Sequence, residues 1–263
     1  MKDKILSHLG AGHIWAGSIR YYPTIDSTNT EGKRLAEANA PHGMVLIADH
    51  QTQGRGRTGN TFHSPKNDGI YLSVILRPNC TPLELSHLTC AVGCAVCNAI
   101  EDVTTVRPQL KWINDIVADG KKLGGILTEL SLSSEGKVTY AVIGIGINCN
   151  QSSFPQEIAG IATSLSLILN RSVHRAELIA AIIDKIYHMQ LHLFTDIQQI
   201  MTQYRKDCIT IGKEILIQKG DESIQATALD VLDDGILVVR YKDGQIGHVN
   251  SGMVHVRGLF GYC

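Results

Sequence analysis

The segment Gly54-Arg55-Gly56-Arg57-Thr58-Gly59 holds the residues of this chain best suited to bind an anion. It is spelled like the dinucleotide fingerprint G-x-G-x-x-G, but two of its x positions are arginines, and residues 60–65 contain a proline and no helical periodicity. We therefore expect a loop here, and not the start of a helix. Glycines let backbone N–H groups approach an anion closely, and guanidinium groups match phosphate oxygens. The segment is predicted to close over a phosphate-bearing ligand, with an exposed basic loop as the alternative.

A second group of charged residues lies at 111–115, with the sequence Lys-Trp-Ile-Asn-Asp, and continues at Lys122. A lysine at the end of a short strand, an acid four residues later and a lysine beyond the Asp119-Gly120 turn form a compact polar set. Taken alone, these residues also fit ordinary Lys–Asp pairing across a turn. The Gly124-Gly125 pair favours a site, because paired glycines in a strand mark a close approach by a ligand or another chain segment.

The stretch Gly144-Ile145-Gly146-Ile147-Asn148 ends another predicted strand. Gly144 and Gly146 are two residues apart and share one face of that strand, which their missing side chains leave bare. A flat ligand or a tightly packed helix would fit such a face equally well.

The composition excludes several classes of protein. The chain has 263 residues and a formal net charge of −1, so it lacks the basic excess of a dedicated nucleic-acid binder. No apolar run reaches the length of a membrane span, and no apolar segment of a signal peptide follows the first lysines. We therefore expect a cytoplasmic protein without a membrane partner, with its seven cysteines reduced.

Cys90, Cys94 and Cys97 have the C-x3-C-x2-C spacing of some iron–sulfur sites. They lie within 85–100, where apolar residues recur at helical spacing, and all three fall on one helix face. A cluster needs a loop that wraps around the metal, so we favour a packed helix with small buried thiols.

The remaining pattern predicts the elements that position these residues. Thr28 and Glu31 have capping-box spacing and predict a helix to about Ala38. The other predicted helices are 85–100, 176–194 and 197–206, and the predicted strands are 45–48, 70–77, 110–112, 124–130 and 138–147. Residues 116–123 are predicted to form a hairpin with Asp119-Gly120 as its turn. After Cys208, short strands at 214–218, 225–231, 236–241, 245–250 and 254–257 predict a small antiparallel barrel. We expect a catalytic domain over 1–208 and a small β domain over 209–263.

In this order and spacing, the motifs resemble those of biotin protein ligases. The family loop GRGRRGR followed by xWxSP reads GRGRTGNTFHSP here, and the family KWPND reads KWIND. The family motifs K-L-x-G-I-L-x-E, D-S-T-N and G-x-G-I-N match 122–129, 26–29 and 144–148. The match spans about residues 20 to 150.

The resemblance implies an α+β fold, with a mixed β-sheet flanked by helices as in class II synthetases and a C-terminal SH3-like barrel. It implies an enzyme that uses ATP and Mg²⁺ to convert biotin to biotinyl-5'-AMP. The enzyme then transfers biotin to a lysine of a biotin carboxyl carrier protein domain, usually one of an acetyl-CoA carboxylase.

The resemblance also implies roles for residues of this chain. The residues expected to bind biotin are Ser27, Thr28, Asn29, Gln51, Arg55, Gly56, Arg57, Lys122 and Gly125. Those expected to bind the nucleotide are Arg55, Arg57, Phe62, Lys111, Asn114 and Asn148. Lys111, Arg57 and Asp115 would be catalytic, and Asp115 would also meet the magnesium carried by the nucleotide.

The chain departs from the family pattern at four positions. Thr58 and Asn60 replace two loop arginines, which predicts a weaker electrostatic hold on the adenylate. Phe62 replaces tryptophan, so stacking on adenine should be weaker. Ile113 replaces the proline of KWPND without removing a reactive group.

Two rival functions remain open. A lipoate ligase shares the fold, but the GRGR loop and the polar residues at 26–29 favour biotin, because lipoate has no ureido group to pair with them. A non-catalytic sensor of the adenylate would not need Lys111, Asp115 and Lys122. About 26 residues precede the Ser27 motif, too few for the winged helix-turn-helix of repressor forms, so we expect no DNA binding. Exposed strand edges leave a homodimer open.

Overall fold

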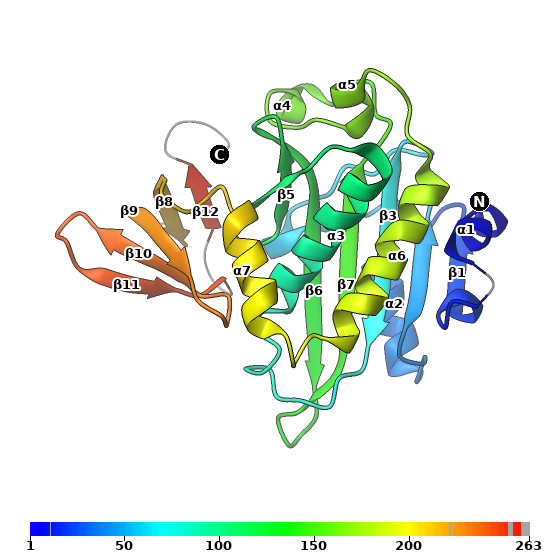
Figure 1. Cartoon of the computed structure of the whole chain (residues 1–263), viewed down its shortest axis with the longest axis horizontal. Coiled ribbons are helices and arrows are strands. Elements are labelled where there is room, and N and C mark those ends of the chain that lie inside the picture. Colours follow the sequence, from blue (N-terminus) through cyan, green and yellow to red (C-terminus); the bar gives the residue numbers. More distant parts are fainter. Residues whose placement is uncertain (11, 221, 252–254, 259–263) are drawn as a thin grey trace.

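The computed structural model describes residues 1–10, 12–220, 222–251 and 255–258. A mixed seven-stranded sheet forms the centre, with strand order β1-β2-β3-β7-β6-β5-β4 (Figure 1). Its strands are β1 (Ile19–Tyr22), β2 (Met44–Ala48), β3 (Gly69–Leu76), β4 (Gln109–Lys111), β5 (Asp115–Ala118), β6 (Lys121–Leu132) and β7 (Val138–Asn148). Only β1 and β2 are parallel; the other neighbours are antiparallel. The predicted mixed sheet is thus confirmed, with β1 as an additional edge strand that the sequence pattern did not reveal.

Helices cover both faces of this sheet. On one face lie α3 (Leu88–Thr104), α6 (Arg175–Leu191) and α7 (Ile197–Asp207), and α2 (Thr28–Glu37) lies behind the sheet in Figure 1. The N-terminal α1 (Lys2–Leu9) packs against α6. The short helices are η1 (Ala16–Ser18), η2 (Arg57–Gly59), α4 (Gln156–Ala159) and α5 (Leu165–Leu169). No helix among the described residues is long and apolar enough to cross a membrane.

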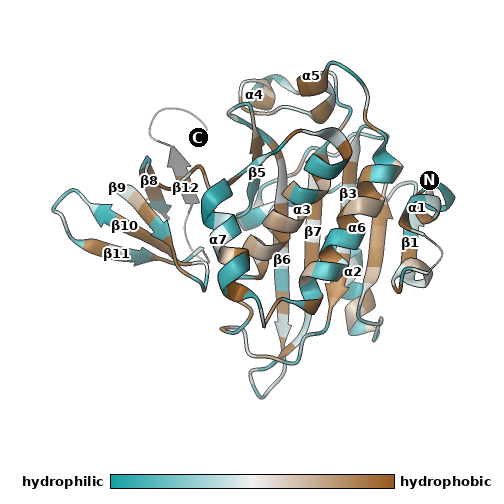
Figure 2. Cartoon of the chain, in the orientation of Figure 1, coloured by the Kyte–Doolittle hydropathy of each residue, from teal (hydrophilic) through white to brown (hydrophobic). Residues whose placement is uncertain are grey.

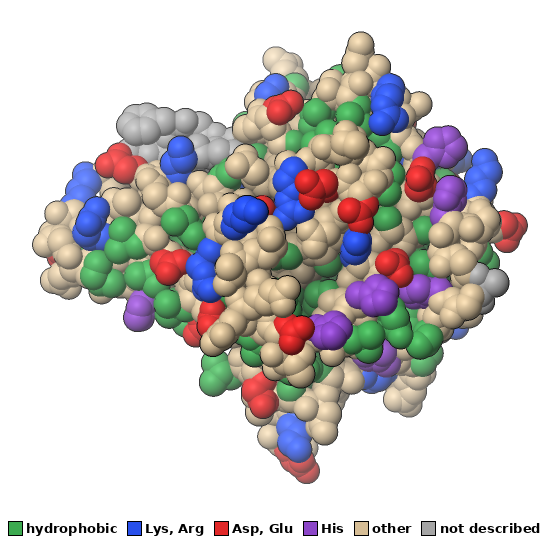
Figure 3. Space-filling model, in the orientation of Figure 1, with side chains coloured by type: hydrophobic (Ala, Val, Ile, Leu, Met, Phe, Trp, Pro, Cys, Tyr) green, Lys and Arg blue, Asp and Glu red, His purple; other side chains and the backbone are tan. Residues whose placement is uncertain are grey.

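The core lies between the sheet and the α3–α6 layer. Every residue of β2 and of β3 is buried, because helices or loops cover both of their faces. Figure 2 shows apolar strands behind helices whose outer sides are hydrophilic. The outer face of the helical layer carries lysines, arginines and acids interspersed, without a field of one sign (Figure 3).

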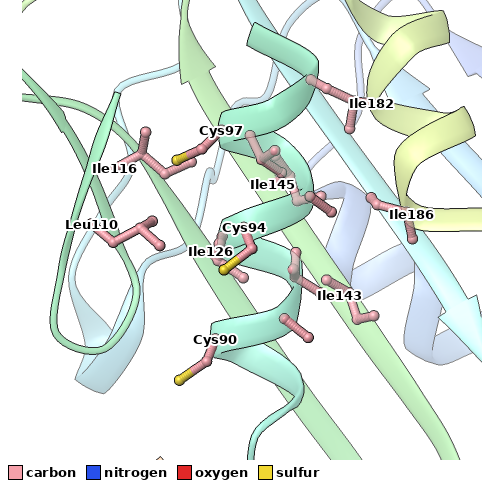
Figure 4. Close-up of a cluster of buried hydrophobic side chains, with 14 of the residues drawn as sticks. Cys90, Cys94, Cys97, Leu110, Ile116, Ile126, Ile143, Ile145, Ile182 and Ile186 are labelled. Carbon is pink, nitrogen blue, oxygen red and sulfur yellow. The ribbon is translucent and has the colours of Figure 1, made fainter. Parts of the chain in front are cut away.

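The helical alternative for the cysteine triad is confirmed. Cys90, Cys94 and Cys97 point from the same side of α3 toward Leu110 and Ile116 (Figure 4). Burial raises the pKa of the Cys94 thiol to about 12, so it stays protonated and unreactive. The described residues contain no group of His, Cys, Asp and Glu arranged to hold a metal ion.

A separate five-stranded sheet forms the C-terminal part, with order β11-β10-β9-β8-β12. Its strands are β8 (Glu214–Lys219), β9 (Glu222–Val231), β10 (Leu237–Tyr241), β11 (Ile246–Val249) and β12 (His255–Gly258). All pairs are antiparallel, as expected from the short strands and turns. Residue 254, the predicted start of the last strand, lies outside the described residues.

Candidate functional site

The arginine-bearing loop leaves the end of β2 as a narrow hairpin. The backbone N–H of Gly56 donates to the carbonyl of Asn60 at 2.7 Å, and that of Phe62 donates to Gly54 at 2.9 Å. The only helical turn in it is η2, three residues long, so no α-helix opens after the glycines. The structure confirms the prediction that residues 54–59 form a loop and do not begin an α-helix.

The start of α2 brings the polar motif of residues 27–29 under this loop. Ser27 is the N-cap residue and accepts from the backbone N–H of Thr30 at 3.5 Å. The predicted capping box of Thr28 and Glu31 is therefore wrong by one residue: Thr28 is already the first helical residue. Its backbone N–H and hydroxyl donate to the Gln51 side-chain oxygen at 2.8 and 3.1 Å.

Side chains from α2 and from the arginine-bearing loop pack against Gly144 and Gly146 of β7. A Cβ atom on Gly144 would lie 2.2 Å from Oδ1 of Asn29, and one on Gly146 would lie 2.7 Å from the ring of Phe62. Both glycines are needed for close approach by protein side chains. The bare face of β7 is therefore covered by Asn29 and Phe62.

The lysines and the acid of the second motif gather at the β4–β5 turn. Lys111 lies opposite Asp115 in the strand register, and Asp115 accepts from the ammonium of Lys122 at 2.6 Å. Arg57 reaches this turn from the loop and donates to the side-chain oxygen of Asn114 at 3.2 Å. Burial lowers the pKa of the Arg57 guanidinium, and nearby Asp115 partly offsets this effect; the group stays charged at neutral pH.

One cavity joins these parts. Ten of the predicted site residues line it: Ser27, Thr28, Asn29, Gln51, Arg55, Gly56, Phe62, Asn114, Lys122 and Gly125. Arg57 and Asp115 adjoin it through Asn114 and Lys122, and Lys111 is buried and lies opposite Asp115 in the strand register. Residues far apart in the sequence thus meet at one place.

Asn148, another predicted ligand, also lies outside the cavity lining. Its side-chain amide donates to the carbonyl of Thr163 at 3.0 Å and of Lys122 at 3.5 Å, and its oxygen accepts from Gln151 at 3.3 Å. In this structure Asn148 supports the backbone of Lys122. Contact with a nucleotide stays a prediction.

The structure adds residues that the sequence analysis did not assign to the site. Ile126, Leu127 and Ile145 also line the cavity, together with Gly144 and Gly146, whose bare face the sequence had already marked as a possible place for a ligand. Glu129 forms an ion pair with Arg55 at 3.2 Å and accepts from Asn29 at 3.1 Å. Its place at the end of the K-L-x-G-I-L-x-E stretch was a signal, but strand periodicity alone gave no reason to select it.

The C-terminal sheet contacts the same region. The indole N–H of Trp112 donates to the carbonyl of Gly235 at 2.9 Å, and its backbone N–H donates to the hydroxyl of Thr210 at 2.9 Å. Arg57 also donates to the carbonyl of Ser251. The turn that carries Asn114 and Asp115 is therefore braced from the C-terminal part of the chain.

The cavity is small in this conformation, about 50 Å³. Sites for organic ligands usually measure roughly 300–1,000 Å³. The Phe62 ring, which lies over Gly146 and edge-on to Tyr71, fills part of the space. A ligand with a ring system therefore requires the loop to shift Phe62 outward.

This arrangement suits a ligand with a polar ring and an anionic end. The buried groups at 27–29 and Gln51 offer donors and acceptors to a ligand, while Arg55 and Lys122 in the lining and the adjoining Arg57 supply positive charge. Such charges, fixed before the reaction, stabilise negative charge that grows in a transition state.

Comparison with known proteins agrees with this geometry. Residues 21–148 match the biotin/lipoate A/B protein ligase family, and residues 210–257 match the biotin protein ligase C-terminal domain. The bifunctional ligase/repressor BirA of Bacillus subtilis is 36% identical over 230 residues, which cover 85% of this chain and 70% of that protein. The biotin–[acetyl-CoA-carboxylase] ligase of Mycobacterium tuberculosis is 30% identical over 98% of this chain and 94% of its own length.

A solved structure of the biotin protein ligase of Aquifex aeolicus in complex with biotin and ATP is also similar. It superposes with a TM-score of 0.78 at 29% identity and covers 92% of this chain and 99% of that chain. Sequence and structure lead to the same result: the chain belongs to the biotin/lipoate A/B protein ligase family and, within it, to the biotin protein ligases.

Proposed function

We propose that this chain activates biotin with ATP to form biotinyl-5'-AMP and pyrophosphate, and then transfers biotin to a lysine of a biotin carboxyl carrier protein domain. The observation that carries the proposal is the single cavity in which the polar groups of α2 face the arginine loop and Lys122. A ureido ring has two N–H donors and one carbonyl acceptor, which match these polar groups. Lipoate offers none of these groups, so it would gain no hydrogen bonds from this part of the cavity.

In the first step, an oxygen of the biotin carboxylate attacks the α-phosphorus of ATP, and pyrophosphate leaves. Lys122 guides the carboxylate, while Lys111 and Arg57 stabilise the charge that develops on the phosphate. Phe62 moves off Gly146 and stacks on the adenine, and Asn114 and Asn148 face the nucleotide. In the second step, the carrier lysine attacks the carbonyl carbon, the amine loses a proton and AMP leaves.

Magnesium fits this site as an ion carried by the nucleotide. Mg²⁺ commonly takes one or two carboxylates plus substrate phosphates and water. Asp115, 18% exposed and beside Lys122, offers one such carboxylate. Its task would be to neutralise phosphate charge while the protein groups align the reactants.

The loop protects the intermediate from water. A mixed anhydride hydrolyses readily, so exclusion of water decides how much of it reaches the carrier. Arg57 is held from two sides, by Asn114 and by the carbonyl of Ser251. Closing the loop therefore depends on the C-terminal part as well as on the loop itself.

The domain organisation belongs to the same proposal. The change in pattern after Cys208, the separate C-terminal sheet and the family match over 210–257 support domains of 1–208 and 209–263. Five short antiparallel strands support an SH3-like barrel for the second domain. The six free cysteines among the described residues fit a cytoplasmic location, and a homodimer through an exposed strand edge stays a prediction.

Transfer in two separated stages tests the function. The protein is first incubated with biotin and ATP, and free ATP is then removed. A carrier domain is added, and the mass of the carrier is measured by mass spectrometry. We expect the biotinyl mass increment on the carrier and none on a control carrier whose target lysine is arginine. Bound adenylate that persists beside the intact carrier would favour the sensor alternative over a ligase.

A further inference from the structure

Glu129 of β6 connects three elements around the cavity. Its Oε2 accepts from the side-chain amide of Asn29 at 3.1 Å and from Arg55 at 3.2 Å. Its Oε1 forms ion pairs with Arg55 at 3.2 Å and with Lys33 at 3.3 Å. The side chain is 19% exposed, so α2, the arginine loop and the sheet share one largely enclosed carboxylate.

The contacts of Asn29 fix which way its amide points. Its NH₂ group donates to the Glu129 carboxylate and, at 3.1 Å, to the carbonyl of Leu127. Both partners can only accept hydrogen bonds. A flipped amide would place its oxygen against two acceptors, one of them charged, so the oxygen must lie on the other side.

That oxygen lies against Gly144, which lines the cavity together with Asn29. Oδ1 of Asn29 accepts from the hydroxyl of Ser73 at 2.7 Å, next to Gly144. A carbonyl oxygen has two lone pairs, so a second donor can still bind. Because Asn29 lines the cavity, a ring N–H of the ligand is the donor that fits.

The same carboxylate holds the loop. Arg55 and Glu129 form a two-point pair, Nη1 to Oε2 and Nη2 to Oε1, both at 3.2 Å. Arg55 is 43% exposed, so without this pair its guanidinium would be solvated and free to move. Glu129 thereby ties the loop to the helix that carries Asn29.

We propose that Glu129 is a positioning residue with two tasks. It fixes the Asn29 amide so that its oxygen accepts a ureido N–H of biotin, and it holds the Arg55 loop over the same cavity. The inference rests on the proposed function and gives that function a determinant of substrate choice outside the direct ligands.

Glu129→Ala and Glu129→Gln separate the two tasks. Alanine removes both. Glutamine keeps one acceptor oxygen, and the buried Asn29 amide needs this acceptor more than the solvated Arg55 does. Glutamine loses the negative charge that pairs with Arg55. Lys33→Met is the matched control, because Lys33 contacts the same carboxylate but is 40% exposed and lies apart from the cavity lining.

The first readout is the ratio of kcat/KM for biotin to that for biotin methylated on either ureido nitrogen. A hydrogen bond supported by a charged group changes such a ratio by about tenfold to a hundredfold. We expect a fall of that size in Glu129→Ala, and ratios near wild type in Glu129→Gln and Lys33→Met. The second readout is release of biotinyl-5'-AMP into solution, which should rise in both Glu129 variants and not in Lys33→Met.

An equal loss of kcat/KM for biotin and for its N-methylated analogues in Glu129→Ala would overturn the proposal. A folding defect alone would lower kcat/KM for all of these substrates by the same factor. Unchanged adenylate release in Glu129→Gln would also overturn it. If the alanine variant does not fold, Glu129→Gln and Arg55→Ala still test the loop task. Biotin turnover by the wild-type chain is measured first, so failure of the proposed function would be seen separately.

Discussion

Replacing Gly144 by alanine should damage stability and biotin binding together. The added Cβ would lie 2.2 Å from Oδ1 of Asn29, whereas ordinary contact begins at 3.4 Å, so the two must separate by about 1.2 Å. Asn29 cannot move that far without losing its bond from Ser73, because Leu127 and Glu129 hold its other end. An unpaired buried polar group costs about 1–3 kcal/mol, and overpacking a similar amount.

The unfolding free energy of Gly144→Ala should therefore fall by about 2–6 kcal/mol, a large part of the total for a typical domain. Biotin affinity should fall at least about tenfold, because Asn29 no longer presents its oxygen correctly. Urea unfolding monitored by circular dichroism gives the first quantity, and isothermal titration calorimetry gives the second.

Two matched variants sharpen this test. In Gly146→Ala the new Cβ would lie 2.7 Å from the half-buried ring of Phe62, which sits on the loop and can move away. Its stability should change by less than about 1 kcal/mol. Gly160→Ala meets nothing within 4 Å and should behave as wild type. Wild-type stability and biotin affinity in Gly144→Ala would refute the reasoning, since Asn29 would then not be rigidly placed.

Further predictions concern catalysis and pH. Lys111→Ala should bind biotin normally but form adenylate at least about a hundredfold more slowly in single-turnover assays; unchanged rates would remove Lys111 from the mechanism. Arg57→Ala should leak adenylate, seen as biotin on bystander proteins in a western blot, whereas clean labelling of the carrier would argue against a lid role. Burial lowers the pKa of His13, with Asp184 opposing this and His188 adding to it. As pH falls, His13 is therefore protonated in the unfolded chain before it is protonated in the folded protein. Its contribution to the free energy of unfolding should be complete above the unfolded pKa of about 6.5 and be lost as pH falls through the folded pKa. His13→Gln should flatten this dependence, and an unchanged slope in that variant would exclude His13.

The site could be predicted from the sequence where glycines and charges mark strand ends. Three segments differ from ordinary strands or turns in their glycines and charged residues: the loop at 54–59, the KWIND turn and the glycines of β7. The order of these motifs along the chain indicated one family. Their convergence follows from the topology, which places β6 and β7 side by side in the centre of the sheet.

Other features depend on partners distant in sequence. The roles of Glu129 and Asn148 are set by contacts with residues 29, 55 and 163, which no local pattern reveals. The helix α1 is short, and it packs against α6 across more than 150 residues of chain. Ser27 and Thr28 are both good caps, so only the backbone geometry decides between them.

Pyrophosphate release from ATP, measured with biotin and with lipoate in parallel, tests the central claim most directly. The account predicts release that depends on biotin and is absent with lipoate, because only biotin satisfies the polar groups around Asn29 and Gln51. Release with lipoate alone would keep the fold and the adenylation chemistry but contradict the assigned substrate.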